Sequence, residues 1–354
     1  MANGAIKNIL AKLLPGSGGI CHSLLLCLRK REVGGLKRPL SLFIFSLLLT
    51  LFMLFSQWDA MSYGNYSSRS GAQSILDKYH EIEKELEQKN SGPVPFHVES
   101  AENKNTSHVD IYGTVKYPFE MVRNNLLLPT NWCDILLSHP KVRACTYKKI
   151  DDTWLFNIYV VNKSSESIED ADEMKFVFRV SELQPEYFDI DFTAHEGPHN
   201  TKDHKFELEA IPLEKNITFI HANYSFGYSL LVYLPMKLFI GSKIGFSITG
   251  TDSAGNPVYV EGLRGTVERD VVYYYLAILA YLDTFQAPSD QRFDRRISEW
   301  YSLTAKFQKQ LAELKKEEYF TDKSQDWGNQ QRLQGNLNSK KVCSTVIICL
   351  RGRN

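Results

Sequence analysis

The sequence has no excess of either charge. Its 354 residues contain 41 lysines and arginines against 41 aspartates and glutamates, so the formal net charge at pH 7 is zero. Binding to a phosphate backbone relies on clustered basic side chains, and we therefore expect no nucleic-acid partner. The sequence also lacks a G-x-S-x-G motif and a Walker motif. Neither the nucleophile elbow of a hydrolase nor a phosphate-binding loop is predicted.

Cysteine is scarce, and its spacing excludes common metal and redox sites. The six cysteines include no C-x-x-C pair, which leaves no basis for a zinc ribbon or a thioredoxin-like site. Cys133 and Cys145 are candidates for a disulfide if this part of the chain is exported. Two buried free thiols are the alternative.

Residues 195–199 read HEGPH and match the H-E-x-x-H motif of zinc peptidases literally. That motif binds zinc on a helix, which places both histidines on one face. Gly197 and Pro198 forbid such a helix, so we expect a solvated turn. A loop site that includes His204 is the remaining metal hypothesis, and we predict neither a metal nor a cofactor.

Long hydrophobic runs are few, and one of them suggests a membrane span. Residues 39–55 carry no charge, and basic residues cluster at positions 29–38 just before them. This length is at the lower limit for crossing a bilayer. The positive-inside rule predicts a basic cytoplasmic segment at 1–38 and a transmembrane signal anchor at 39–58. The rest of the chain is then exported, to the periplasmic side if the source is bacterial.

The anchor is expected to stay uncleaved. A signal peptidase site needs small residues in an A-x-A pattern, and Trp58 occupies one of those positions. A cleaved signal peptide is the main alternative. A buried soluble helix is the other, and the one-sided basic flank argues against it.

Residues 59–94 are predicted to form a linker and a juxtamembrane helix that runs to about Lys89. Ile75, Tyr79, Ile82 and Leu86 form a narrow apolar stripe at helical spacing. Packing of this stripe against the following domain is our first expectation. A dimeric coiled coil is the alternative, although only two heptads are available.

From about residue 97 the hydrophobic period changes to two, which predicts strands. Hairpin-length gaps separate the later runs and leave no room for crossover helices, so the sheet should be antiparallel. Residues 119–140 interrupt it with a helical pattern that is broken at Pro129. Phe206, Leu208 and Ala210 alternate with charged residues, so one face of the sheet should be dry and the other wet.

Residues 262–285 read GLRGTVERDVVYYYLAILAYLDTF and begin with clustered charges. The apolar part, residues 271–285, is too short to cross a bilayer comfortably and has no basic flank. We therefore expect a core helix that lies across the sheet. Because it is apolar almost all round, neighbouring helices or a bound apolar molecule must cover the sides that the sheet does not.

Two further segments complete the chain. Residues 291–320 are predicted to form a C-terminal amphipathic helix whose apolar stripe includes Ile297, Trp300 and Leu311. Residues 321–354 are polar and rich in Gln, Asn, Ser and Lys, so we expect a disordered tail apart from the apolar run VCSTVIICL at 342–350.

The order of strand, broken helix pair, six strands and long apolar helix resembles the START-like superfamily, also called Bet v 1-like, SRPBCC or helix-grip proteins. The resemblance covers residues 95–290 and includes the segment YPFEMVRNNLLLPTNWCDILLSHPKV. It implies an α+β fold in which a curved antiparallel sheet wraps a long C-terminal helix. The space between the sheet and the helix holds a hydrophobic ligand. Residues 227–262 depart from the pattern with an added apolar stretch and a hairpin. The whole chain resembles membrane-anchored or exported bacterial proteins of unknown role.

Tyrosines and a charged pair are the candidate ligand-binding residues. Tyrosines give apolar walls with polar tips, and an arginine at a pocket mouth can hold a carboxylate or a lipid headgroup. Core filling by the tyrosines and ion pairing within the helix are the structural alternatives. The candidates are Tyr224, Tyr228, Tyr233, Arg264, Glu268, Tyr274 and Tyr275.

We predict a noncatalytic, membrane-anchored domain that binds a lipid or another hydrophobic small molecule on the exported side of the membrane. One alternative is a cyclase or dehydratase that uses His221 or Glu268 as an acid or base in the same cavity. The other is an envelope interaction module whose cavity is filled by its own side chains. A largest void below roughly 300 Å³ would favour that module.

Overall fold

The computed structural model describes residues 71–89, 94–103, 105–229, 231–233, 243–311 and 314–351, with the side chains of 340–351 excepted. The predicted cytoplasmic segment 1–38 and signal anchor 39–58 lie outside these residues, as does most of the apolar stretch after residue 229. Within the described residues, no helix combines the length and hydropathy that a bilayer crossing requires.

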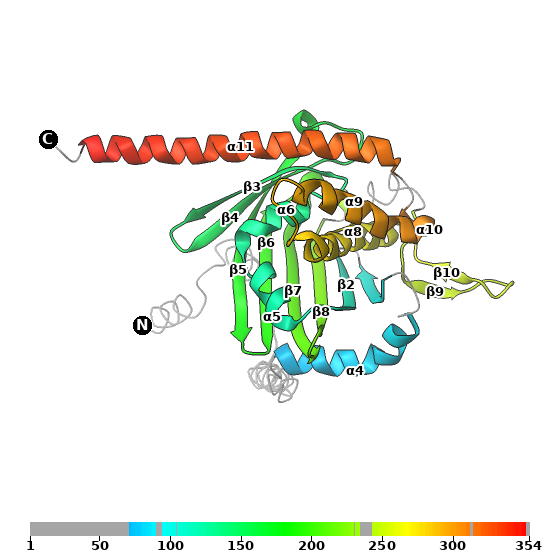
Figure 1. Cartoon of the computed structure of the whole chain (residues 1–354). Coiled ribbons are helices and arrows are strands. Elements are labelled where there is room, and N and C mark those ends of the chain that lie inside the picture. Colours follow the sequence, from blue (N-terminus) through cyan, green and yellow to red (C-terminus); the bar gives the residue numbers. More distant parts are fainter. Residues whose placement is uncertain are drawn as a thin grey trace, which may run out of the picture. The chain divides into compact units, whose positions relative to one another are not determined.

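The described domain is built on one antiparallel sheet of eight strands in the order β1-β2-β8-β7-β6-β5-β4-β3 (Figure 1). Its strands follow the alternating runs of the sequence, and consecutive strands pair except where β2 joins β8. Their bounds are β1 Phe96–Glu102, β2 Thr106–Val115, β3 Val142–Ile150, β4 Thr153–Val160, β5 Asp172–Gln184, β6 Tyr187–Glu196, β7 Lys202–Glu214 and β8 Ile217–Gly227.

Short helices fill the predicted interruption between β2 and β3. Helix α5 (Phe119–Leu126) ends before a short 3₁₀ helix, η2 (Pro129–Asn131), and α6 (Trp132–Leu136) follows at once. Pro129 has no N–H to donate, so it stands at the start of η2 rather than within a longer helix. Two further 3₁₀ turns, η3 (Ile168–Asp170) and η4 (Pro198–Asn200), lie in loops. The hairpin of β9 (Ile248–Thr251) and β10 (Pro257–Tyr259) forms a separate two-stranded sheet.

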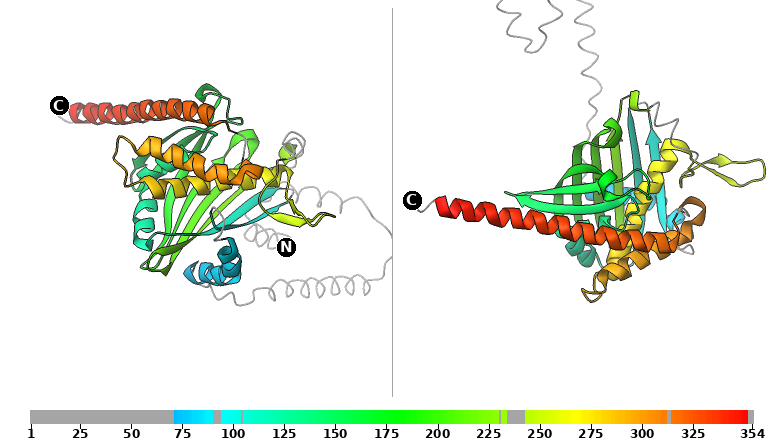
Figure 2. Two further views of the ribbon diagram at one scale, coloured as in Figure 1. Left: turned by 45° about the vertical axis from the view of Figure 1, so that its right-hand side comes forward. Right: turned by 90° about the horizontal axis from the view of Figure 1, so that it is seen from above.

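Helix α8 (Gly262–Thr284) lies across the inner face of the main sheet (Figures 1 and 2). Its apolar residues are buried on all sides because the sheet, α6 and α9 (Arg292–Thr304) cover it together. Leu208 and Ala210 are buried in the same core, as the strand alternation predicts. An α+β helix-grip arrangement is therefore present.

The start of α8 differs from the sequence prediction. We placed the charged residues before the helix, but α8 begins at Gly262 and its first turn holds no acidic residue. Glu268 and Asp270 therefore lie within the helix and do not act on its N-terminal dipole. Gly262 has φ of 71°, a conformation that glycine adopts without strain, so the chain can turn into the helix at that point.

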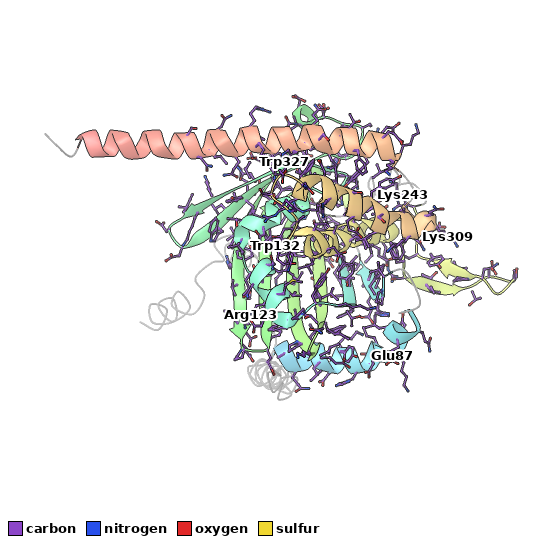
Figure 3. All side chains as sticks on the ribbon, in the orientation of Figure 1. Glu87, Arg123, Trp132, Lys243, Lys309 and Trp327 are labelled. Carbon is purple, nitrogen blue, oxygen red and sulfur yellow. A yellow bond between two sulfur atoms is a disulfide. The ribbon has the colours of Figure 1, made fainter. Side chains whose placement is uncertain are left out.

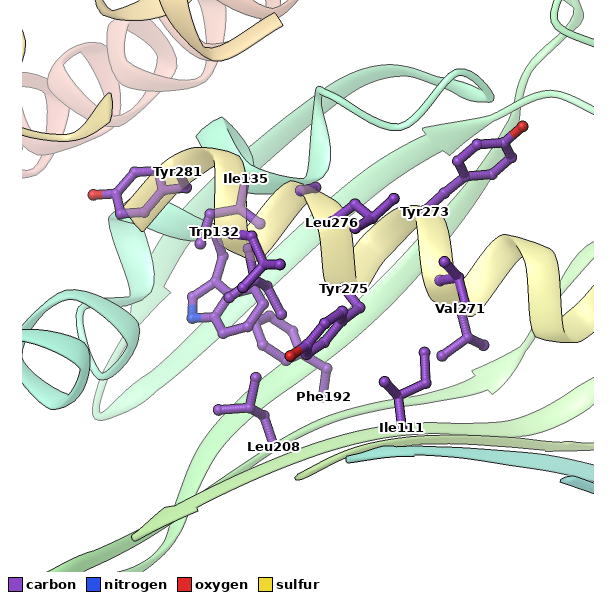
Figure 4. Packing of buried hydrophobic residues seen from close by; sticks show 14 of the residues in the cluster. Ile111, Trp132, Ile135, Phe192, Leu208, Val271, Tyr273, Tyr275, Leu276 and Tyr281 are labelled. Carbon is purple, nitrogen blue, oxygen red and sulfur yellow. The ribbon is translucent and has the colours of Figure 1, made fainter. Parts of the chain in front are cut away.

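Tyr275 brings α8 very close to the sheet. A Cβ at Gly113 of β2 would lie 2.1 Å from the Tyr275 hydroxyl oxygen, so only glycine fits at this position. Tyr275 points from α8 toward the sheet (Figure 4). Its ring also packs edge-on against Phe96, with ring centroids 5.8 Å apart. This end of the core is therefore tightly packed.

Helix α4 (Gly71–Lys89) covers part of the outer face of the sheet (Figure 1). The predicted stripe is used here, because Ile75, Ile82 and Leu86 form a second buried cluster with residues of the sheet: Tyr187, Ile211 and Phe219. We predicted a wholly wet outer face, and that is wrong beneath α4. Tyr187 and Phe219 point outward in the strand alternation, and the helix buries them.

The predicted amphipathic helix at 291–320 is not continuous. It consists of α9, a 3₁₀ turn η5 (Ala305–Phe307) and the short α10 (Gln308–Leu311), and a new helix begins at Lys316. Ile297, Trp300 and Leu311 are buried as the stripe requires. The break lets the following helix turn toward the edge of the sheet.

We expected the polar tail at 321–354 to be disordered apart from the run 342–350. That prediction is wrong for residues 321–341, which are helical. Helix α11 (Lys316–Arg351) runs along the edge strand β3 (Figures 1 and 2). The Gln330 side chain accepts a hydrogen bond from the backbone N–H of Cys145 (3.0 Å). The Gln334 amide both accepts from and donates to the backbone of Tyr147 (2.9 and 3.0 Å). Polar residues thus replace a ninth strand, because they satisfy backbone groups that the edge would leave unpaired.

Buried charges hold the first turns of α11 in place. Lys323 is fully buried and donates to the carbonyl oxygens of His139 and Val142, both at 2.8 Å. Asp326 accepts from Lys323 and Arg143 at 2.8 and 2.9 Å. On the neighbouring surface, Phe293 of α9 stacks on Trp327 of α11 with ring centroids 4.9 Å apart (Figure 3). Buried ions need such partners, so these contacts fix the register of α11 on the sheet.

A disulfide joins Cys133 of α6 to Cys145 of β3. The sequence left open a disulfide or two buried free thiols, and the structure contains the disulfide. It fastens α6 to the edge strand that α11 covers on its other side.

Candidate ligand-binding site

An apolar pocket of about 70 Å³ lies between the sheet and α8. Side chains from both layers line it, and several keep part of their surface exposed to it. Trp132 of α6 packs edge-on against Phe192 of β6, with ring centroids 5.0 Å apart, at one wall (Figure 4). The walls are Trp132, Ile135, Leu136, Ile158, Val160, Met174, Phe176, Phe192, Phe206, Tyr224, Tyr274 and Ile278.

Two tyrosine hydroxyls are the polar groups of this pocket. The Tyr224 hydroxyl lies 2.7 Å from Nδ1 of His204 on β7. The other nitrogen, Nε2, lies 2.9 Å from the Thr201 hydroxyl, which donates its own proton to the carbonyl oxygen of Pro198. Thr201 can therefore only accept from His204, so Nε2 carries the proton and Nδ1 accepts. Tyr224 donates to Nδ1 and has oxygen lone pairs left for a ligand.

Burial keeps these groups neutral. It lowers the pKa of His204 to about 4 and raises the pKa values of the Tyr224 and Tyr274 hydroxyls above their ordinary value. Near pH 7 the imidazole is therefore uncharged and both phenols keep their protons. These three described groups can form hydrogen bonds, but none of them has a pKa near 7.

The structure separates the seven predicted ligand-binding residues. Tyr224 and Tyr274 line the pocket, whereas Tyr275 packs against the sheet at the tight end of α8. Tyr228 is buried and donates to the carbonyl oxygens of Asn103 and Thr106 at 2.8 and 2.9 Å. The ring of Tyr233 stacks on Tyr228 with centroids 5.6 Å apart. These last two residues are structural, and neither lines the apolar pocket.

Arg264 and Glu268 form a sealed contact, which makes them poor candidates for a pocket mouth. Glu268 has no exposed surface and accepts hydrogen bonds from the backbone N–H groups of Phe246 and Ser247 at 2.6 and 2.9 Å. Its other oxygen accepts from the Ser100 hydroxyl, which itself accepts from Arg264 Nε at 2.6 Å. This network ties α8 to β1 and to the chain before β9. It leaves Glu268 no path to the apolar pocket.

His221, the other acid or base considered from the sequence, lies on the outer face of the sheet. Its ring nitrogens lie 2.8 Å from Asp110 and 2.9 Å from Glu209. Burial opposes its positive charge, but the two carboxylates outweigh that effect and raise its pKa to about 9. The backbone of β8 therefore separates the cationic imidazole from the pocket.

Residues 195–199 do not form an α-helix, and their two histidines, His195 and His199, have different partners. His195 is at the end of β6 and pairs with Asp203 at 3.0 Å, while His199 in η4 lies 2.7 Å from the Asn162 side chain. In the part of the chain that the structure describes, no group of three or more His, Cys, Asp or Glu side chains is arranged to hold a metal ion.

Sequence reasoning missed His204 as the hydrogen-bond partner of the pocket residue Tyr224. It has the same alternation phase as Phe206 and Leu208, which would have placed it on the inner face. We used it only as a possible partner for the histidines at 195–199. The strand period is the signal that would have found it.

A second, polar cavity of about 270 Å³ adjoins the first half of α8. Its walls come from the loop before β3, the loop after β4, the chain before β9 and α8 itself. Lys141 binds Asp270 with its ammonium 2.8 Å from both carboxylate oxygens. Burial opposes ionisation of Asp270, but the ammonium groups of Lys141 and Lys243 outweigh that effect and hold its pKa below the ordinary value. Sequence reasoning did not predict this cavity.

His139 stands between the two cavities. Its ring stacks on Tyr274, with centroids 4.2 Å apart, and its Nε2 lies 4.0 Å from Asp270. The backbone N–H of Lys141 donates to Nδ1, so the proton is on Nε2, and burial lowers the pKa of His139 to about 3. A neutral, almost fully buried imidazole thus contacts Tyr274, which lines the apolar pocket, and lies near Asp270, which lines the polar cavity.

Comparisons with known proteins add structural likenesses of low identity. No family model and no curated protein matches the sequence. A conserved protein from Geobacillus kaustophilus is 12% identical, with 51% of this chain and 95% of that chain covered and a TM-score of 0.32. The Zhui aromatase/cyclase from Streptomyces sp. R1128 is 12% identical, with 55% and 94% covered and a TM-score of 0.30. Truncated norcoclaurine synthase from Thalictrum flavum is 10% identical, with 40% and 87% covered and a TM-score of 0.29. At these TM-scores the likenesses carry no argument about function.

Proposed function

We propose that the domain is a noncatalytic binding module for a small hydrophobic molecule that carries one hydrogen-bond donor. The observation that supports it most is the apolar pocket, whose largely apolar walls include Tyr224 and Tyr274. Because Tyr224 gives its proton to His204, its oxygen offers an acceptor to an O–H or N–H group of the ligand. A few fixed polar groups in an apolar wall are typical of ligand sites.

The chemistry of the walls favours binding over catalysis. An acid or base works best with a pKa near the operating pH. His204 is shifted well below that range, and the two tyrosines are shifted above their already high ordinary value. The acid and base suggested by the sequence, Glu268 and His221, do not line the pocket.

The volume of the pocket sets the size of the ligand. About 70 Å³ is well below the roughly 300 Å³ or more of a pocket for a drug-sized molecule. The pocket as it stands suits a single ring or a short chain, and a whole lipid would require it to widen or to extend elsewhere. The same small volume favours the alternative of an interaction module with a filled interior, so the experiment must separate the two.

The membrane context remains a prediction from the sequence. If residues 39–58 anchor the chain, the binding module is held on the exported side of the membrane, near a supply of apolar molecules. Protease treatment of source cells whose cytoplasmic membrane is intact tests that orientation. If the protease digests the domain only after the cytoplasmic membrane is lysed, the domain is on the cytoplasmic side and the prediction is wrong.

Binding of phenol and anisole to the full chain tests the function directly. Both have one ring, but only phenol can donate to Tyr224. We expect saturable binding of both by calorimetry or ligand-observed NMR, with phenol about fivefold tighter, the factor of one ordinary hydrogen bond. Tyr224→Phe should abolish the preference for phenol, whereas Tyr159→Phe, on the outer face of β4, should keep it.

A second variant separates binding from a filled interior. Ile278→Phe adds volume to the pocket wall and should weaken binding of both probes, while Val180→Phe on the exposed surface of β5 should not. Absence of saturable binding by the unmodified protein would reject the binding module and support the filled interaction module. Binding that Ile278→Phe leaves unchanged would place the probes elsewhere.

A further inference from the structure

The last part of helix α11 differs in sequence from the rest of that helix. Residues 342–350 read VCSTVIICL, in which only Ser344 and Thr345 are polar. After Asp326 the sequence contains no aspartate or glutamate. Basic residues flank the apolar run on both sides: Lys340, Lys341, Arg351 and Arg353. The helix therefore ends in a short apolar segment between two pairs of positive charges.

Helix α11 runs in the same direction as β3 along the edge of the sheet. Gln330 contacts Cys145 and Gln334 contacts Tyr147, so four residues of helix advance beside two residues of strand. Both steps measure about 6 to 7 Å, because a helix rises about 1.5 Å per residue and a strand about 3.3 Å. The helix therefore keeps pace with the strand as far as Gln334.

The helix continues after this strand has ended. Three residues of β3 follow Tyr147, which is about 10 Å of strand. Seventeen residues of α11 follow Gln334, which is about 25 Å of helix. Roughly 15 Å of helix therefore extends past the end of β3, starting near residue 341 (Figures 1 and 2). The apolar run thus begins where the sheet that supports the helix ends.

The described residues around this point are open to solvent. The polar side chains of Asn336 and Ser339 on α11 are exposed, and a Cβ added at Gly335 would meet no atom within 4 Å. Ile150, the last residue of β3, keeps 45% of its surface exposed. Two lysines and two aspartates balance one another at 148–152, so the excess positive charge at this end comes from α11.

We propose that residues 340–351 of α11 bind a membrane surface that contains anionic lipids. A helix of this composition lies in the interface, with apolar residues against the acyl chains and basic residues among the headgroups. The nine residues of the run span only about 14 Å, less than half of a bilayer core, so the segment lies on the membrane and does not cross it.

The charges decide between a membrane and other partners for this segment. Two copies of the chain would bring basic pairs together, and the predicted anchor at 39–58 has a basic flank of its own, so both would repel the end of α11. Anionic headgroups attract it instead. This contact goes beyond the proposed ligand binding, and it does not require residues 39–58 to be an anchor.

The two cysteines of the run, Cys343 and Cys349, allow a direct test. The full chain is assembled, one copy each, into nanodiscs of phosphatidylcholine with or without phosphatidylglycerol, and a water-soluble maleimide is added. We expect both cysteines to be labelled at least tenfold more slowly in the anionic discs, and added salt to restore the rate. Peptide mass spectrometry measures it. Asn336→Cys, at an exposed position beside the sheet, is the matched control and should be labelled equally in both discs.

Two variants separate the electrostatic and the apolar parts of this contact. Lys340→Gln/Lys341→Gln/Arg351→Gln should lose most of the difference between the two discs. Ile347→Asp/Ile348→Asp should be labelled rapidly in both, because burial of the carboxylates in lipid is costly. Both variants lie past the contacts of α11 with β3, so circular dichroism should show an unchanged fold.

Three outcomes would overturn the proposal. The first is labelling at the same rate in the two discs, whether fast or slow. The second is a charge variant that keeps the full difference. The third is protection without lipid that grows with protein concentration, which would place a second copy of the chain on the run.

Discussion

His204 and His221 lie on opposite faces of one sheet, on the neighbouring strands β7 and β8, and their pKa values move in opposite directions. His204 faces the apolar core among neutral partners, and its pKa falls to about 4. His221 faces outward between two carboxylates, and its pKa rises to about 9. Both rings are largely buried, so the partners and not the burial decide the sign. On the inner face the histidine is therefore neutral, and on the outer face it is a cation held by two carboxylates.

Removal of the cation on the outer face should have the largest effect. His221→Asn leaves Asp110 and Glu209 without their common positive charge, and we expect the free energy of unfolding to drop by about 3 kcal/mol at pH 7. Urea unfolding followed by circular dichroism measures it. His108→Asn is the control, because His108 is 48% exposed and 3.9 Å from Asp110, and it should cost less than about 0.5 kcal/mol. Equal losses in the two variants would refute a special role of His221.

The packing of the inner face can be broken at Gly113. Gly113→Ala should lower the free energy of unfolding by about 2 kcal/mol, because the new methyl group meets the Tyr275 hydroxyl. Tyr275→Phe removes that hydroxyl, which has no hydrogen-bond partner, so the double variant should recover part of the loss. Gly250→Ala, with nothing within 4 Å, is the matched control. No recovery in the double variant would contradict this account of the contact.

The pH dependence of stability should have opposite signs for the two histidines. The folded pKa of His221 is raised, so its contribution is fully present below pH 6.5 and is lost as pH rises from 6.5 through 9. The folded pKa of His204 is lowered, so its contribution is present above pH 6.5 and is lost as pH falls through 4. We expect each change to be about 1 to 2 kcal/mol after solvent screening. Unfolding curves across pH measure both, and His221→Asn should abolish the alkaline loss alone.

The smallest effect should come from an unfavourable charge on the outer face. Burial and the neighbouring Glu209, Glu207 and Asp191 raise the pKa of Asp189 to about 7, so its ionisation destabilises the fold as pH rises from 3.8 through 7. Asp189→Asn should therefore raise the free energy of unfolding by about 1 kcal/mol at pH 8 and by less at pH 5. Asp172→Asn, at the exposed start of β5, is the control and should leave the free energy of unfolding unchanged at both pH values. A gain that does not grow with pH would speak against charge repulsion.

The sequence predicts the inner layer of this fold well, because its signals are local. The alternation of Phe206 and Leu208 places the strands, and the apolar length of 271–285, in which Asp283 is the one acidic residue, identifies a core helix. The outer layer is harder to predict from the sequence, because Tyr187 and Phe219 are buried only by the packing of α4 on the sheet. Helix α11 is missed for a related reason. Its polar residues resemble a disordered tail until their partners, more than 180 residues earlier, are known.

The candidate site divides in the same way. Tyr224 and Tyr274 are predictable, because aromatic residues on a core helix and a core strand meet at the inner face. Arg264 and Glu268 were assigned to a pocket mouth because their distant partner Ser100 on β1 cannot be inferred from spacing. The polar cavity likewise depends on segments that only the tertiary fold brings together.

The hydrogen bonds from Gln330 and Gln334 to β3 have a consequence for how the protein is made. Cys145 and Gln330 are 185 positions apart, so the β3 border of the sheet stays open throughout the synthesis of everything between them. An open border offers its backbone to any other extended chain. The border is thus protected from self-association only once α11 has been added, and a product terminated before α11 would be the form most inclined to aggregate.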